Sequence, residues 1–167
     1  MTDQANTGLP VPQGLSSVAA RLRESFAEGQ ANKTREVEIP GYDGLFGVFR
    51  AIDDYTEVRP VIARAAKARG DEAQKEISIA AETLLLSSVD TFAMVDGKRV
   101  DIGLPLGKGL YDTLWEGDES HVQVDNDRQA LSLLIPSTVS LVALAGQVDL
   151  WSKQSLDRTG EEILGES

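Results

Sequence analysis

The chain has 167 residues, of which 41% are hydrophobic, only 5% are aromatic and none is cysteine. Its formal net charge of −11 repels nucleic-acid phosphates, and no basic patch with interleaved aromatic residues compensates for it. The lack of cysteine excludes disulfides, thiolate metal sites and cysteine nucleophiles. We therefore expect one domain with an aliphatic core and flanking tails, which does not bind nucleic acid.

Residues 1–34 are predicted to form a flexible N-terminal arm. Residues 1–14 are rich in Gly, Pro, Gln, Asn and Thr, and they are expected to be disordered because they bury too little surface to offset the entropy of ordering. Within residues 15–28, apolar side chains recur every three or four positions, which predicts a short amphipathic helix. Leu22 and Phe26 lie on its apolar stripe, which is expected either to dock on the domain or to bind a partner.

Two β-hairpins are predicted from side-chain alternation and turn residues. The first covers residues 35–52, with a Pro-Gly-Tyr-Asp-Gly turn cluster at residues 40–44. The second covers residues 91–102 and turns at Asp96 and Gly97, both of which accept positive φ. A two-residue type I′ turn is therefore expected in the second hairpin.

Two helices are predicted between the hairpins. Asp54 begins a capping-box pattern for a helix that runs to about Arg69, and Pro60 is expected to kink this helix or delay its start. Asp71 is expected to cap a second helix over residues 72–88, which has a broad apolar face. With the helix pair near the carboxyl end, the order ββαα-ββ-αα indicates an α+β, predominantly helical fold rather than a parallel βαβ architecture.

A run of twenty uncharged residues, 129–148, precedes the carboxyl end. Its length alone would permit a membrane span, but Pro136 stops a helix and Ser137 or Thr138 starts the next one. We therefore expect two short helices, each too short to cross a bilayer, whose apolar surface belongs to the core or to a partner.

The predicted organisation has three parts. The arm over residues 1–34 is followed by an α+β domain over residues 35–153, in which the last helix ends. Residues 154–167 are predicted to form a frayed acidic tail.

No catalytic, cofactor or metal site is indicated. His121 is the only histidine, and we interpret it as a surface residue because no nucleophile motif accompanies it. Residues 103–109 lack the spacing of a phosphate-binding loop. The acidic clusters at residues 53–54 and 125–127 do not supply the spread oxygen ligands of a Ca²⁺ loop, and both precede predicted helices, where they serve as caps.

The apolar face of the carboxyl-terminal helix pair is the main candidate partner surface. Its side chains recur at spacings of three and four, which suits helix-in-groove binding. Trp151 is open to two interpretations, as a core residue or as an anchor for a partner. The candidate partner-binding residues are Leu134, Leu141, Leu144, Val148 and Trp151, with Leu22 and Phe26 of the arm.

Five segments, taken in order, carry a family resemblance. They are residues 37–45 (Val-Glu-Ile-Pro-Gly-Tyr-Asp-Gly-Leu) with the extended stretch to residue 52, the Asp-Tyr-Thr-Glu-Val start at 54–58, Ala-Ala-Glu-Thr-Leu-Leu-Leu at 80–86, the hairpin at 92–102 and the helix pair at 127–151. Over roughly residues 35–152, this order resembles that of the tail assembly chaperones of long-tailed phages and prophages of actinobacteria.

The resemblance implies a non-enzymatic protein without cofactor. Such chaperones bind the long, helical, apolar tape measure protein in the host cytoplasm, keep it soluble and help to recruit the major tail protein. The resemblance also implies a translational frameshift, which would place the divergence of a longer product near Leu156. Many weakly bound, self-associating copies along one client are expected to act by avidity. The alternative is a structural virion component, such as a tail-tube or connector subunit, and neither function requires contact with a membrane.

Overall fold

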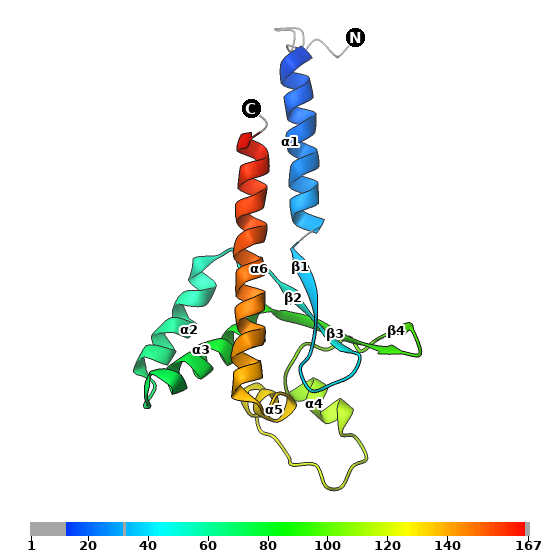
Figure 1. Ribbon diagram of the computed structural model, residues 1–167, viewed down its shortest axis with the longest axis vertical. Coiled ribbons are helices and arrows are strands. Elements are labelled where there is room, and N and C mark those ends of the chain that lie inside the picture. The colour runs from blue at the N-terminus through cyan, green and yellow to red at the C-terminus, as the bar shows by residue number, and fades with distance from the viewer. Residues whose placement is uncertain (1–12, 32, 166–167) are drawn as a thin grey trace, which may run out of the picture.

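The computed structural model describes residues 13–31 and 33–165, and the side chains of residues 14–28 and 33–154. This part of the chain contains six helices and one four-stranded antiparallel sheet (Figure 1). The predicted fold class, α+β and predominantly helical with two β-hairpins, is confirmed. The predicted disorder of residues 1–12 lies outside the described residues.

The two predicted hairpins join into a single sheet. Strand β1 (Thr34–Glu38) pairs with β2 (Leu45–Arg50), and β3 (Ser88–Val95) pairs with β4 (Lys98–Asp101). Strands β2 and β3 pair in the centre, so the order across the sheet is β1-β2-β3-β4. Strand β3 begins earlier than predicted because the chain leaves the preceding helix directly into its pairing with β2.

Two local features fix the register of the sheet. Asp96 and Gly97 have φ values of +51° and +75°, so the predicted two-residue turn between β3 and β4 is confirmed. Across the strands, the rings of Phe46 and Phe92 stack with centroids 5.1 Å apart. The Arg99 guanidinium lies 3.7 Å from the Phe92 centroid, so an arginine covers this ring.

Helices α2 (Tyr55–Lys67) and α3 (Glu72–Ser87) connect β2 to β3. The side chains of Asp54 and Asp71 each accept a hydrogen bond of 2.9 Å from a backbone N–H in the following turn, which confirms both predicted caps. Pro60 lies inside α2 but does not delay its start, because the Asp54 cap already fixes the first turn.

The predicted helix break at the Pro136-Ser137 pair is confirmed. Helices α5 (Asp127–Leu134) and α6 (Thr138–Gly165) meet there at 107°, and the Ser137 hydroxyl accepts from the backbone of the first turn of α6 at 3.2 Å. The prediction that both helices are short is wrong. Helix α6 has 28 residues and includes most of the segment predicted as a frayed tail, since no further proline interrupts it.

The described helices differ in how far they meet the requirements of a membrane span. Among the described helices, none taken singly combines the length and the apolar character that a membrane span requires. Helices α5 and α6 meet those requirements only together, as a pair that is sharply bent.

The hydrophobic core lies between the sheet and four helices, α3, α5, α6 and the short α4 (Lys108–Leu114). Phe49 from β2, Leu84 from α3, Leu110 from α4 and Leu131 from α5 are each fully buried. The core is aliphatic, as the low aromatic content predicts.

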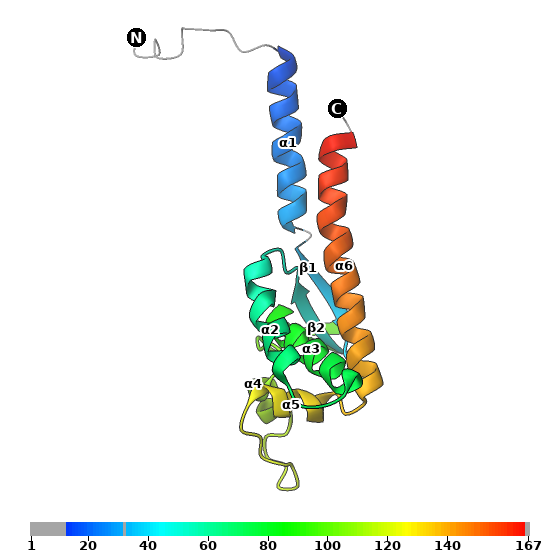
Figure 2. The ribbon, with the colours of Figure 1, turned by 90° about the vertical axis from the view of Figure 1, so that its left-hand side faces the viewer.

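Helix α1 (Gln13–Ala31) stands apart from this core. It is longer at both ends than the predicted helix over residues 15–28. Helix α1 and the carboxyl-terminal part of α6 project together from the body and run antiparallel (Figures 1 and 2). The structure therefore consists of a packed body and a two-helix projection.

Candidate functional site

The structure places four of the predicted partner residues in the core. Leu134, Leu141, Leu144 and Val148 are exposed by only 1%, 5%, 2% and 3%. The prediction that they form an exposed contact surface is therefore corrected, because they are the side chains through which α5 and α6 pack on the rest of the body. Of the four, Val148 also borders the groove described below. Trp151 is half-buried, so its exposure does not decide between a core residue and an anchor for a partner.

Leu22 and Phe26 are the predicted partner residues that remain accessible. They are exposed by 42% and 64%, and Leu15 and Val18, at 57% and 49%, continue the row toward the start of α1. We call these four residues the α1 stripe. It lies on the projection, so the structure does not combine it with the core-facing residues of α5 and α6 into one surface (Figure 2).

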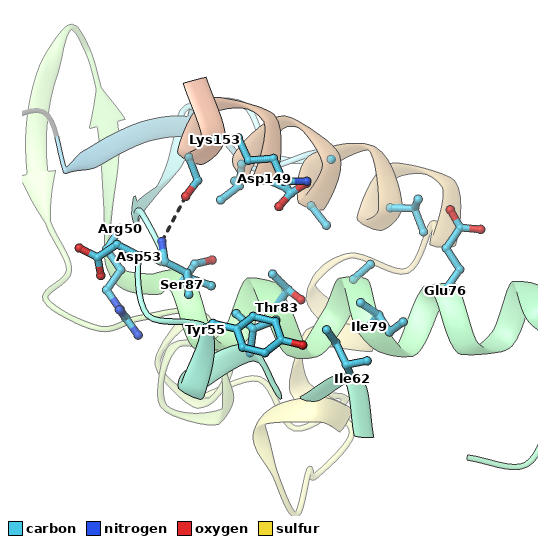
Figure 3. Close-up of a pocket in the computed structure, with 18 of the residues that line it drawn as sticks. Arg50, Asp53, Tyr55, Ile62, Glu76, Ile79, Thr83, Ser87, Asp149 and Lys153 are labelled. Carbon is cyan, nitrogen blue, oxygen red and sulfur yellow. Dashed lines mark hydrogen bonds and ion pairs between the residues drawn. The ribbon is translucent and has the colours of Figure 1, made fainter. Parts of the chain in front are cut away.

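A groove of about 900 Å³ lies between α2 and α3 on one side and α6 on the other. Its apolar lining includes Val58 and Ile62 of α2, Ile79 and Ala80 of α3, and Val142, Ala145 and Val148 of α6. Figure 3 shows Ile62 and Ile79 across the opening from the α6 residues. The groove is thus walled by helices from two distant parts of the sequence.

The groove exists because α2 and α3 carry more apolar surface than the core covers. Ala81 and Leu84 of α3 are fully buried, and Val61 of α2 is nearly so. Ile62 and Ile79 remain 43% and 38% exposed at the groove. A helix that is apolar over more than one face has a second face available to a partner. The apolar periodicity of α2 and α3 indicates that each helix has a wide apolar face. Only the tertiary arrangement shows which of these apolar residues the core leaves exposed.

Charged side chains border the groove, and most of them are paired. Lys153 Nζ lies 2.8 Å from Asp149 Oδ2, and this hydrogen bond raises the pKa of Lys153. Lys75 lies 3.7 Å from Glu72, whereas Glu76 has no ion-pair partner among the described residues. The lining holds five carboxylates and three cationic side chains, so its net charge is negative.

One end of the groove is tied to α6. The backbone N–H of Ile52, just before α2, donates to the hydroxyl of Ser152 on α6 at 3.2 Å. Arg50 forms an ion pair with Glu57 in the first turn of α2. The Ile52–Ser152 bond holds the β2–α2 connection against α6, and the Arg50–Glu57 ion pair ties the end of β2 to α2 at this end of the groove.

His121 and the loop at residues 103–109, both considered for chemistry, have structural contacts away from the groove. His121 Nδ1 lies 2.7 Å from the carbonyl oxygen of Asp118, and its ring lies 6.0 Å from that of Tyr111. Lys108, the basic residue of the 103–109 loop, pairs with Asp112 at 2.6 Å. None of these side chains lines the groove.

The acidic clusters are used at helix starts. Asp54 caps α2, and the Asn126 side chain accepts a hydrogen bond of 2.9 Å that caps α5. Asp127 accepts a hydrogen bond of 2.9 Å from the backbone of Lys108, which joins α4 to α5. In the described residues, no group of three or more His, Cys, Asp or Glu side chains is arranged to hold a metal ion.

Comparisons with known proteins yield no relative. No protein-family model matches the chain, no curated protein is significantly similar to it, and no solved structure has a significantly similar fold. The groove and the α1 stripe are therefore the features from which a function must be inferred.

Proposed function

We propose that the protein is a non-enzymatic tail assembly chaperone of a long-tailed phage or prophage, which binds the tape measure protein and keeps it soluble. The observation that supports this most is the groove between α2, α3 and α6, with aliphatic side chains on both walls. A groove of this kind accepts the apolar face of an amphipathic helix. The client's identity is suggested by the sequence resemblance over residues 35–152.

Binding in this groove is expected to be weak at a single site. A client helix would place aliphatic side chains, spaced by three and four residues, against Ile62, Ile79 and Val142. Each Å² of apolar surface removed from water contributes about 25 cal/mol, before the cost of association is subtracted. Many copies along one long client would then act by avidity.

The polar side chains of the groove also favour binding over catalysis. The Ser87 hydroxyl donates to the carbonyl oxygen of Leu84, and the Ser152 hydroxyl accepts from the backbone of Ile52. Both serines are buried and bonded to the backbone. No histidine or cysteine lines the groove, so its side chains do not supply the nucleophile and base of a Ser-His or Cys-His pair.

Co-expression with the tape measure protein tests the proposal. The chain should co-purify with this client and raise its soluble yield. A variant with Ile62→Glu and Ile79→Glu places two charges in the groove and should lose both effects. Val139→Glu is the matched control, because Val139 is 78% exposed on α6 and does not line the groove.

The variants must first be shown to fold, by far-ultraviolet circular dichroism and a cooperative thermal transition. If the folded groove variant retains the client as well as the control does, the groove is not the client site. If the unmodified chain neither binds the tape measure protein nor raises its yield, the chaperone function itself is wrong.

A further inference from the structure

Helix α1 carries an apolar surface that its own chain leaves largely uncovered. All four residues of the α1 stripe are more than 40% exposed, although α6 lies beside α1 (Figure 2). Single helices of this length are marginally stable in water, and most helices in proteins depend on burying an apolar face. Among the described side chains, the α1 stripe is therefore a helix face that lacks the cover which a stable helix needs.

The stripe and the groove match in length. The stripe runs over twelve residues, from Leu15 to Phe26. The α6 wall of the groove also runs over twelve residues, from Val142 to Lys153. At a rise of about 1.5 Å per residue, the ends of each are about 16–17 Å apart. A helix laid along the groove can therefore place the whole stripe against its aliphatic lining.

The charges match as well. At 100° per residue, Arg21 and Arg23 flank Leu22 on opposite sides of the stripe. The groove has carboxylates on both walls, with Glu76 on α3 and Asp149 on α6, and its lining is net negative. A copy of α1 in the groove would bring arginines toward carboxylates, whereas the net charge of −11 makes two copies of the chain repel each other overall.

The stripe does not reach the groove of its own chain. Helix α1 ends at Ala31, close to the start of β1 at Thr34, and extends away from the body beside α6 (Figures 1 and 2). The groove is lined by α2, α3, residues 142–153 of α6 and the end of β2 with its connection to α2, and by no described side chain of α1. A second copy of the chain can supply the helix that the first copy cannot.

We propose that α1 of one copy binds in the groove between α2, α3 and α6 of another copy. The contact joins two different surfaces, so two copies can exchange their α1 helices in a two-fold dimer, or successive copies can build a ring or an open chain. One part of this inference rests on the proposed function, namely that a client helix binding in the same groove would displace α1. Self-association would then cover the apolar groove until the client arrives.

A mixing experiment tests this arrangement by sedimentation velocity on the full chain without client. The stripe variant carries Leu22→Glu and Phe26→Glu, and the groove variant carries Ile62→Glu and Ile79→Glu. Each variant alone should self-associate at least about tenfold more weakly than the unmodified chain. Their equimolar mixture should form a one-to-one dimer, because one variant keeps an intact groove and the other an intact α1. The Val139→Glu control should associate normally.

The mixture separates this proposal from its alternatives. If the two folded variants stay monomeric together while the unmodified chain associates, the proposal is overturned. It is also overturned if the stripe variant associates normally, if the groove variant associates normally (which would mean that stripes pair with stripes), or if the unmodified chain is monomeric at all concentrations. Circular dichroism confirms folding of each variant. Since no client is present, any of these failures leaves the result of the co-expression experiment unaffected.

Discussion

The hydroxyl of Ser152 accepts a hydrogen bond of 3.2 Å from the backbone N–H of Ile52, a residue 100 positions earlier in the chain. Ser152 is only 8% exposed, so this bond lies inside the junction between α6 and the β2–α2 connection. It sits at the end of the groove and holds the two walls together. The groove's shape is therefore coupled to one buried hydroxyl.

Replacing Ser152 by alanine should lower stability by about 1–2 kcal/mol, because the Ile52 N–H loses its acceptor in a partly buried site. Urea denaturation measures the change. Ser132→Ala is the control, since Ser132 is exposed on α5 and its hydroxyl bonds only to the carbonyl oxygen of Gln129. Equal midpoints for the two variants would show that the Ser152 bond does not hold the groove.

Leu144→Ala should lower the free energy of unfolding by about 2–5 kcal/mol, the usual cost of removing a buried leucine side chain. Leu144 is 2% exposed and packs in the core, whereas Val139, on the same helix, is 78% exposed. Val139→Ala should change stability by no more than about 0.5 kcal/mol. Chemical denaturation of both variants checks this pair, and similar losses would contradict the assignment of Leu144 to the core.

The position of Leu144 shows what apolar periodicity does and does not predict. Spacing of three and four residues identifies the apolar face of a helix, but the same pattern results whether a sheet, another helix or a partner covers that face. Local rules were sufficient for the Asp96-Gly97 turn and for the Asp71 cap, because both depend on neighbours in the chain. The central pairing of β2 with β3 depends on long-range contacts, and it was not predicted.

The groove escaped prediction for the same reason. Ile62 lines the groove from α2, and it lies next to the buried Val61, which does not line it. In sequence, these two β-branched aliphatic residues are nearly equally apolar. Which one faces the groove depends on where α6 packs, and the sequence contains no local signal for that position. The stripe of α1 was predictable because a single helix pattern defines it.

Two glycine substitutions should change stability in opposite directions. Gly107 has φ +150°, and a Cβ there would lie 2.6 Å from Asp127 Oδ1, so Gly107→Ala should cost about 1–3 kcal/mol. Gly146 lies inside α6 with nothing within 4 Å of its added Cβ, so Gly146→Ala should stabilise by about 0.5–1 kcal/mol. Thermal and urea denaturation give both signs, and a stabilised Gly107→Ala variant would refute the steric account.

The Asp54 cap should make stability depend on acid pH. Hydrogen bonds from the Thr56 side chain and backbone hold the pKa of Asp54 below its ordinary value of 3.8. A carboxyl with a lowered folded pKa contributes stability above its unfolded pKa and loses it as pH falls through the folded value. Asp54→Asn keeps a capping acceptor without this titration. Denaturation between pH 2 and pH 5 should therefore show a shallower acid loss in Asp54→Asn, and parallel curves would contradict the assignment.

Charge at the groove should control self-association if α1 of a second copy binds there. Glu76 has no ion-pair partner among the described residues, so Glu76→Lys changes the field met by Arg21 and Arg23 without breaking an internal ion pair. The association constant should fall by about three- to tenfold at low salt, and the difference from the unmodified chain should shrink as salt screens the interaction.

Glu119→Lys is the matched control, because Glu119 lies in the loop after α4 and does not line the groove. Sedimentation velocity at two salt concentrations distinguishes a local effect from the loss of net negative charge, since both variants change the net charge equally. An equal response of the two variants would mean that the groove's own carboxylates do not guide the second copy.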